Sequence, residues 1–368
     1  MTLHKGTVLT LSRPRRKERF ARAVLIWGLL WYAVFNLFPL LIQDRTTEFP
    51  WHTIGAAMEA RKLPKLRQLA AEDGDRPLVL MMGSSRVCWA FRAGDLDGMP
   101  DSDGRPLRVY NYGIPATGPI YELLAVRRLL AEGIRPRLLL IEFLPTLMCK
   151  HHHGALNEEN LMVVESIGAR RLLQWLPYLH RPATSAGLWL GSRVYPWYAF
   201  RHQIRLQATC LVNRRSCPTY GPIDESGWHI PFATDWPIFE QWSRLAIERV
   251  NYYPAISRFR LAKEPTRALH ELLDLCRRER IPTALVIMPE SSQFRGWYSY
   301  GSKKPLRGLL DELRRTYGVE VIDANRWLGD WDFEDGQHAV LHGVKVFTSR
   351  LRAELPRLLA RSQTAKSN

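Results

Sequence analysis

The sequence predicts an α/β fold built on a doubly wound parallel sheet of about five strands. Two observations predict it. Short runs that are apolar throughout, such as residues 78–82 (LVLMM) and 138–141 (LLLI), alternate with longer amphipathic segments of helical period. Such runs are typical of strands buried on both faces, which the intervening helices would cover. The chain also has 368 residues, of which 46% are hydrophobic, enough to bury one enlarged domain and an accessory segment.

The N-terminal region predicts a membrane anchor. Residues 1–22 form a basic cytoplasmic tail, and residues 23–42 are 20 residues without a charge. Such a helix spans about 30 Å, the thickness of a hydrocarbon core. The preceding basic residues place the N-terminus in the cytoplasm, so the rest would face the periplasm or cell exterior from the cytoplasmic (inner) membrane. A cleaved signal peptide is the alternative, which is disfavoured because no small-residue cleavage site follows Pro39.

The strands and helices then follow in order. Residues 43–76 form a connector containing an amphipathic helix, and the α/β domain comprises residues 77–144 and 265–362. The predicted strands are 76–83, 107–113, 137–143, 283–289 and 319–324, and the predicted helices are 119–133, 265–282, 304–318 and 341–362.

Residues 145–264 interrupt this alternation and are rich in Trp, Tyr, His and Arg. We expect a largely helical insertion beside the ligand cleft, because the segment is too long for a loop and too hydrophobic for disorder. Its aromatic residues can stack on sugars or, more simply, form its own core. Cys210 and Cys217 can close a disulfide, whereas Cys88, Cys149 and Cys276 are predicted as buried thiols.

Composition argues against several functions. Of the formal charge of +16, residues 1–22 carry +6 and the rest is scattered along the chain, and no nucleic-acid recognition motif accompanies it. The sequence CKHHHG (149–154) is predicted to be a solvated loop rather than a metal site, because no second ligand pair has suitable spacing. We therefore expect no nucleic acid partner, no metal and no cofactor.

The candidate chemistry lies at two distant positions. Ser84 and Ser85 directly follow the first strand, and Asp335 and His338 stand three residues apart before the last helix. A carboxylate that orients an imidazole allows the imidazole to deprotonate a serine hydroxyl, which is otherwise a weak nucleophile. Taken alone, the serines are better explained as a helix N-cap, and Asp335 likewise as a cap of the last helix. The joint occurrence of the serine after the first strand, Gly113 after the second and Asp-x-x-His before the last helix favours an active site.

The order Ser…Asp-x-x-His resembles the SGNH/GDSL hydrolase superfamily. The resemblance implies that Ser85 is the nucleophile, that His338 is the base oriented by Asp335, and that the Ser85 and Gly113 amides form the oxyanion hole. It covers residues 78–143 and 283–359, and His342 corresponds to a non-catalytic position. The third block departs from the family, since Glu142 stands near the place where an asparagine donor is expected. Losing one such donor slows catalysis by about 100- to 1,000-fold.

The anchor and the missing asparagine resemble the branch of membrane-anchored SGNH-like partners of membrane-bound O-acyltransferases, as in alginate acetylation and teichoic-acid D-alanylation. That resemblance implies transfer of an acyl group to, or its removal from, a cell-surface polysaccharide, possible partnership with such an acyltransferase, and an acyl-serine intermediate. The alternative is a catalytically weak glycan-binding or scaffolding partner. Arg86 is a candidate contact for a substrate carboxylate or phosphate, and a structural salt bridge is the alternative.

Overall fold

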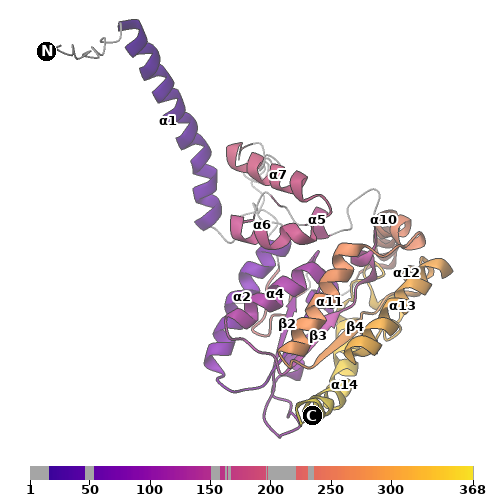
Figure 1. The fold of residues 1–368 in the computed structure, drawn as a ribbon. Coiled ribbons are helices and arrows are strands. Elements are labelled where there is room, and N and C mark those ends of the chain that lie inside the picture. Colours follow the sequence, from indigo (N-terminus) through magenta and orange to yellow (C-terminus); the bar gives the residue numbers. More distant parts are fainter. Residues whose placement is uncertain are drawn as a thin grey trace, which may run out of the picture.

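The computed structural model describes residues 16–45, 54–150, 158–161, 164, 167–195, 197, 221–230 and 236–367. Its centre is a five-stranded sheet in the order β2-β1-β3-β4-β5, in which every neighbouring pair is parallel (Figure 1). The strands are β1 (Leu78–Gly83), β2 (Arg108–Gly113), β3 (Leu138–Glu142), β4 (Thr283–Ile287) and β5 (Glu320–Asp323). The predicted α/β class and the five parallel strands are confirmed.

Both faces of the sheet are buried, which explains why its strands are apolar throughout. Along β1, Leu80 and Met82 belong to one hydrophobic cluster, whereas Val79 and Met81 belong to a second. Successive side chains of a strand point to opposite faces, so the two clusters lie on the two sides of the sheet. A half-exposed sheet would instead have alternated apolar and polar residues.

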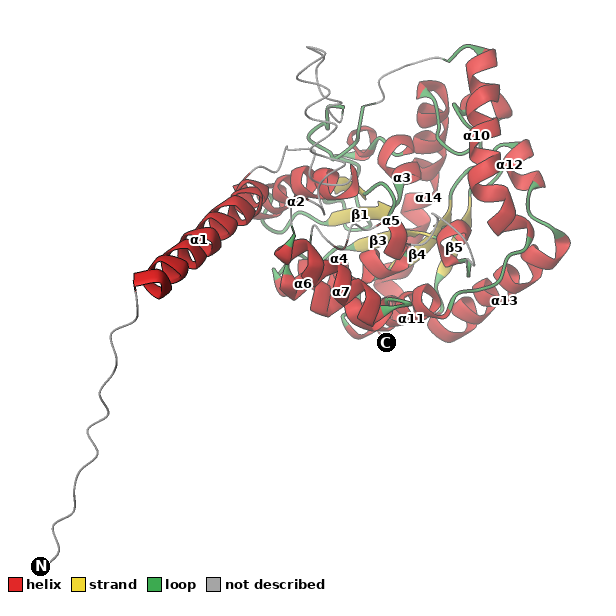
Figure 2. Cartoon of the chain, turned by 90° about the horizontal axis from the view of Figure 1, so that it is seen from above, coloured by secondary structure: helices red, strands yellow, loops and turns green. Residues whose placement is uncertain are grey.

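Helices cover the two faces, as the alternating pattern predicts (Figure 2). The first cluster includes side chains from the connector helix α2 (Ile54–Glu72), α4 (Pro119–Ala131), α11 (Lys263–Arg278) and α13 (Tyr300–Tyr317). The second includes side chains from the short helix α3 (Ser85–Ala90) and from the terminal helix α14 (Leu341–Ser367). The helix α12 (Ser292–Gly296) follows β4 and is too short for its period to appear in the sequence.

The described parts of the insertion are mostly helical. They are α5 (Glu158–Leu161), α6 (Ala169–Trp175), α7 (Pro182–Val194) and α10 (Ile238–Ser257), with short 3₁₀ turns at Pro145–Met148 and Leu176–Tyr178. Residues 221–230 are irregular and lie against the edge of β2, where the Ser226 carbonyl accepts a hydrogen bond from the Asn111 amide at 2.8 Å. The three histidines of CKHHHG and the predicted Cys210–Cys217 pair lie outside the described residues. Cys88, Cys149 and Cys276 are buried free thiols, as predicted.

The first helix, α1 (Arg16–Arg45), includes the whole predicted anchor and projects from the domain (Figure 1). Its large apolar side chains between Val24 and Phe35 are exposed, and the side chains of residues 36–45 lie outside the described set. Within the described side chains, no helix is long and apolar enough to cross a membrane.

Candidate active site

The strand order brings the candidate residues to one edge of the sheet. β1 ends at Gly83, β2 ends at Gly113, and both strands run in the same direction, with these two glycines paired in register. The loop that carries Asp335 and His338 precedes α14, which packs against α3. Functional sites of open parallel sheets lie at this carboxyl edge.

The two serines after β1 have different roles. The Ser84 hydroxyl accepts a hydrogen bond from the Arg86 amide at 3.2 Å and so caps α3. The Ser85 hydroxyl instead lies 2.8 Å from His338 Nε2. The cap and the candidate nucleophile are therefore adjacent residues, and both explanations of the Ser-Ser pair apply, each to one serine.

His338 and Asp335 complete a hydrogen-bonded relay to Ser85. Asp335 Oδ2 lies 2.5 Å from His338 Nδ1, and Asp335 Oδ1 accepts the backbone amides of His338 and Gln337 at 2.9 and 3.1 Å. With its carboxylate fixed by two amides, Asp335 holds the imidazole with Nε2 toward Ser85. This is the arrangement in which an imidazole acts as a general base for a hydroxyl.

Burial and charge set the protonation of this pair. Burial raises the pKa of Asp335, but the His338 ring and the two amides outweigh it, so the pKa lies below its ordinary value. Burial lowers the pKa of His338, yet Asp335, followed by Glu334 and Glu248, raises it above the ordinary 6.5. The imidazolium formed when His338 takes the serine proton is thereby stabilised.

The oxyanion role of Gly113 stays a prediction, and the structure gives its amide a partner within the protein. The Gly113 amide donates to Asn111 Oδ1 at 2.9 Å, so it is already used within the protein. The glycine is required for a different reason: a Cβ atom there would lie 2.4 Å from the backbone nitrogen of Cys88. Gly113 lets α3 approach β2 closely. No hydrogen bond is found for the Ser85 amide among the described residues.

Glu142 supports the turn that carries Ser84 and Ser85. Its side chain is 2% exposed, and Oε2 accepts the Ser84 amide at 2.6 Å. Burial raises the pKa of this carboxyl, and the Arg86 charge and the Ser84 contacts oppose the rise. The residue near the missing asparagine therefore binds the turn itself, an arrangement the sequence pattern could not indicate.

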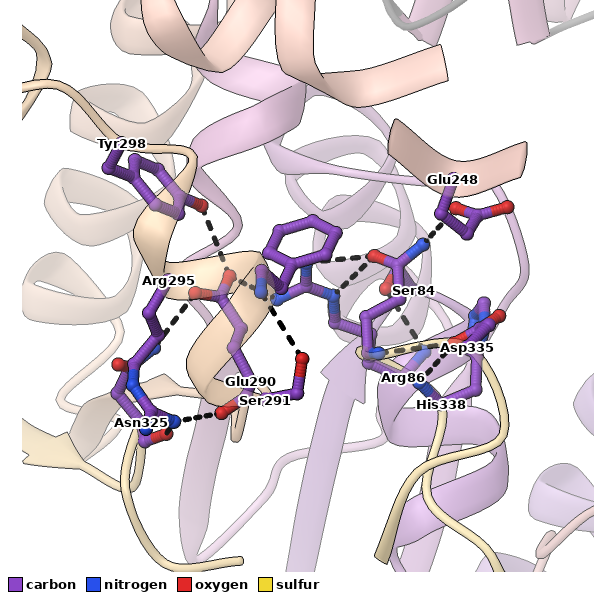
Figure 3. A network of polar contacts seen from close by, with 12 residues as sticks. Ser84, Arg86, Glu248, Glu290, Ser291, Arg295, Tyr298, Asn325, Asp335 and His338 are labelled. Atoms are coloured by element: carbon purple, nitrogen blue, oxygen red, sulfur yellow. Dashed lines mark hydrogen bonds and ion pairs between the residues drawn. The ribbon is translucent and has the colours of Figure 1, made fainter. Parts of the chain in front are cut away.

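Arg86 is a structural residue, which corrects its candidate role as a substrate contact. The residue is 3% exposed; Nη1 donates to Glu290 Oε1 at 2.9 Å, and Nε and Nη2 donate to Gln337 Oε1 at 3.1 and 2.8 Å (Figure 3). A buried guanidinium requires such compensation. The alternative of a salt bridge, with Glu290 as partner, is the one observed.

The Arg86 network joins the Ser84–Ser85 turn to the loop that carries Asp335 and His338. In the sequence, Gln337 stands between Asp335 and His338. Its Nε2 donates a hydrogen bond to Glu248 Oε2 at 2.7 Å. Glu290 also accepts hydrogen bonds from Tyr298 and Asn325. In Figure 3 these side chains form a chain of contacts that runs past Asp335 and His338. These contacts hold together residues that are far apart in the sequence: Arg86 and Glu290 are separated by 204 positions, and Ser85 and His338 by 253.

Lys62 was missed by the sequence analysis because it lies in the connector helix. Its side chain is fully buried, and Nζ donates to the Gly113 carbonyl at 2.7 Å and to Asn111 Oδ1 at 3.2 Å, with Cys88 Sγ at 3.5 Å. Burial lowers the pKa of Lys62. Only its position in the amphipathic pattern of 54–74 could have indicated burial, and lysine at such a position usually remains exposed.

Two further groupings of histidine and carboxylate occur between Asp332 and His342. His342 is exposed and its Nδ1 contacts Asp332 Oδ1 at 2.5 Å, so it takes no part in the relay, as expected. Glu334, Asp335 and His338 place potential metal ligands within 4.8 Å of one another. Both His338 ring nitrogens are already engaged, Nδ1 by Asp335 and Nε2 by Ser85. The arrangement therefore fits proton transfer better than metal binding.

The fold and the relay define an α/β protein with a Ser-His-Asp site at the carboxyl edge of its sheet. A family model described as "Protein of unknown function (DUF1574)" matches residues 38–167. The matched stretch includes Ser85, Gly113 and Glu142, and it ends before Asp335 and His338. No curated protein matches the chain.

Proposed function

We propose that this protein is an extracytoplasmic serine acyl-ester enzyme that acts on a cell-surface glycan through an acyl-serine intermediate. The observation that carries the proposal is the Ser85–His338–Asp335 relay, with contacts of 2.8 and 2.5 Å. Two further features support the proposal. One is the resemblance to the SGNH/GDSL superfamily, and the other is the position of the relay at the carboxyl edge of a parallel sheet of order β2-β1-β3-β4-β5.

The reaction follows from the relay. His338 Nε2 accepts the hydroxyl proton as Ser85 Oγ bonds to the ester carbonyl carbon, giving a tetrahedral oxyanion. When the intermediate collapses, the ester C–O bond breaks and the leaving alcohol takes the proton from His338. The oxygen of an acceptor hydroxyl then bonds to the acyl carbon while His338 takes its proton. The bond from that carbon to Ser85 Oγ breaks, and Oγ recovers the proton from His338. If that hydroxyl belongs to a glycan the protein is a transferase, and if it is water the protein is an esterase.

The oxyanion would be held by backbone amides. The Ser85 amide at the start of α3 is the first donor. Because the Gly113 amide donates to Asn111 Oδ1, we expect the second donor to be another backbone amide, and the loop after β2 is our candidate. Ala116 in this loop adopts a φ of 65°, a left-handed conformation that costs a non-glycine residue about 1 kcal/mol or more and is often retained for function.

Membrane attachment and partners belong to the same proposal. The exposed apolar side chains of α1 support an anchor at residues 23–42 that holds the domain outside the cytoplasmic membrane. The substrate would be a polysaccharide or another acylated glycan, and a membrane-bound O-acyltransferase is the proposed source of acyl groups. The apolar N-terminal helix and the glutamate near the place of the missing asparagine together favour this branch over a soluble esterase.

A second candidate function has an observation of its own. Gly113 donates to Asn111, and Glu142 replaces the asparagine donor, so two expected oxyanion contacts are lacking. Each lost donor slows acyl transfer by about 100- to 1,000-fold. A protein with so weak a centre would bind and present the glycan to the acyltransferase rather than carry the acyl group itself.

Acyl-enzyme formation distinguishes the two candidates. The full chain in detergent is incubated with an activated acetyl ester and followed by intact mass. We expect one acetyl adduct, which Ser85→Ala and His338→Ala abolish. His342→Ala, one helical turn from the base and hydrogen-bonded elsewhere, is the matched control and should retain the adduct. A folded wild-type protein that forms no adduct would support the binding function instead.

A further inference from the structure

Helix α10 of the insertion lies against residues 335–338, the loop that carries the proposed base. The two middle residues of this loop, Gly336 and Gln337, both contact α10. Gln337 Nε2 donates its hydrogen bond to Glu248 at 2.7 Å (Figure 3). A Cβ atom on Gly336, whose φ is 94°, would lie 2.6 Å from Cδ1 of Leu245. An element outside the parallel sheet therefore holds the loop in place.

Glu248 stands in the row of residues by which α10 packs on the domain. Leu245, Tyr252 and Ile256 of this row belong to one hydrophobic cluster with α12, and their spacing of three and four residues places them on one helix face with Glu248. A half-buried carboxylate on such a face costs free energy unless a partner compensates it. Packing alone would favour an apolar residue at this position, so the contact of Glu248 with Gln337 indicates a different role.

Two opposite charges fix the orientation of the Gln337 amide. Its oxygen accepts hydrogen bonds from Arg86 Nε and Nη2 at 3.1 and 2.8 Å, and its nitrogen donates to Glu248. A flipped amide would place its NH₂ group against the guanidinium and its oxygen against the carboxylate. The backbone amides of Gln337 and His338 both donate to Asp335 Oδ1. Glu248 is thereby connected to His338 through one oriented residue.

The charge of Glu248 also acts on the imidazole. Among the described residues, the titratable and charged side chains around His338 are Asp335 and Glu334 of its own loop, Glu248 and Tyr252 of α10, Glu142 of β3 and Arg86 of α3. Burial lowers the pKa of His338, and Asp335, followed by Glu334 and Glu248, raises it above the ordinary value. Of these three carboxylates, Glu248 alone lies outside the loop, so it can be altered while the loop sequence stays intact.

We propose that Glu248 is a positioning residue that acts on His338 through Gln337, so that α10 of the insertion is part of the catalytic unit. The inference rests on the proposed acyl-serine chemistry at Ser85 and assigns the insertion a part in it. Glu248 holds the loop in the position that directs the base to the serine. Its charge favours the imidazolium that forms when His338 takes the serine proton.

Two substitutions separate position from charge. Glu248→Gln retains an oxygen that can accept the hydrogen bond from Gln337 and removes the charge, whereas Glu248→Ala removes both. Acetyl-adduct formation is followed on the full chain in detergent between pH 5 and 9. Glu248→Ala should lower the maximal rate about tenfold, and Glu248→Gln should restore most of it. In Glu248→Gln, half-maximal acylation should move to lower pH by about half a unit.

Glu240 provides the matched control, because it is an exposed carboxylate of the same helix. Glu240→Gln should match the parent in rate and in pH dependence. Equal losses in both Glu248 variants without a change in pH dependence would overturn the proposal, as would a Glu248→Ala protein that reacts at the parent rate. In a Gln337→Leu background, Glu248→Ala should cause little further loss, and additive losses would contradict the route through Gln337.

Titration of the His338 ring by NMR tests the contact without ester chemistry. In the full chain with isotope-labelled histidine, the His338 signal is the one absent from His338→Ala. Its pKa should be lower in Glu248→Gln than in the parent, and unchanged in Glu240→Gln. A parent that forms no adduct but shows this difference would count against the acyl-ester function alone. Equal pKa values in the parent and in Glu248→Gln would overturn this inference.

Discussion

His338 determines how the proposed reaction depends on pH. Its pKa is raised above 6.5, because Asp335 and two further carboxylates outweigh the effect of burial. The base acts only when neutral, so acylation should rise with pH and reach half its maximum above 6.5. The measurement is the rate of acetyl-adduct formation between pH 5 and 9. Half-maximal acylation below 6.5 would contradict this assignment of the base.

The raised pKa of His338 also affects stability, with a definite sign. A group that binds its proton more tightly in the folded state stabilises the protein below the unfolded pKa. That contribution is lost as the pH rises through the folded pKa. Acylation and the His338 contribution to stability should therefore change in opposite directions over the same pH range.

Lys62 predicts a second pH effect. Because burial lowers its pKa below 10.5, the unfolded chain binds more protons in the alkaline range, and this residue makes the free energy of unfolding rise with pH up to about 10.5. Lys62→Met keeps an unbranched side chain, one atom shorter than lysine, and removes the charge. We expect the variant to gain less stability than the parent as the pH rises from 7 to about 10.5 in denaturant titrations. If the unfolding free energies of the variant and the parent change with pH in parallel, burial does not lower the pKa of Lys62.

At the scale of elements, the close approach of α3 and β2 is the critical contact. Gly113→Ala would place a Cβ atom 2.4 Å from the Cys88 nitrogen and 2.8 Å from its Cα, both backbone atoms that cannot rotate away. We expect a loss of about 1–3 kcal/mol in unfolding free energy and displacement of Ser85 from His338, with loss of the adduct.

A glycine in α13 provides the matched control for this substitution. Gly308 is exposed, and a Cβ atom there meets nothing within 4 Å. Gly308→Ala should therefore raise the unfolding free energy by about 0.5–1 kcal/mol through helix propensity alone. Chemical denaturation measures both variants, and a Gly113→Ala protein as stable as the parent would show that α3 can move away from β2 without cost.

At the scale of the whole molecule, stability depends on burial at both faces of the sheet. Phe347 of α14 is fully buried in the second cluster, with its ring 5.9 Å from that of Trp327. Phe347→Ala should cost about 3–5 kcal/mol. Phe239 of α10 is 77% exposed, and Phe239→Ala should change the unfolding free energy by less than about 0.5 kcal/mol. Equal changes in thermal or denaturant midpoints would contradict this distinction.

The sequence by itself determined the strands, most helices and the Ser…Asp-x-x-His order. These features are local: a strand buried on both faces is apolar at every position, and Asp335 is three residues from His338. Tertiary structure alone decided the partners of Gly113, Glu142, Arg86 and Lys62. Arg86 meets Glu290 across 204 positions, and Ser85 meets His338 across 253. No local period encodes such a pairing, because the chain geometry that creates it exists only once the sheet and its covering helices are assembled.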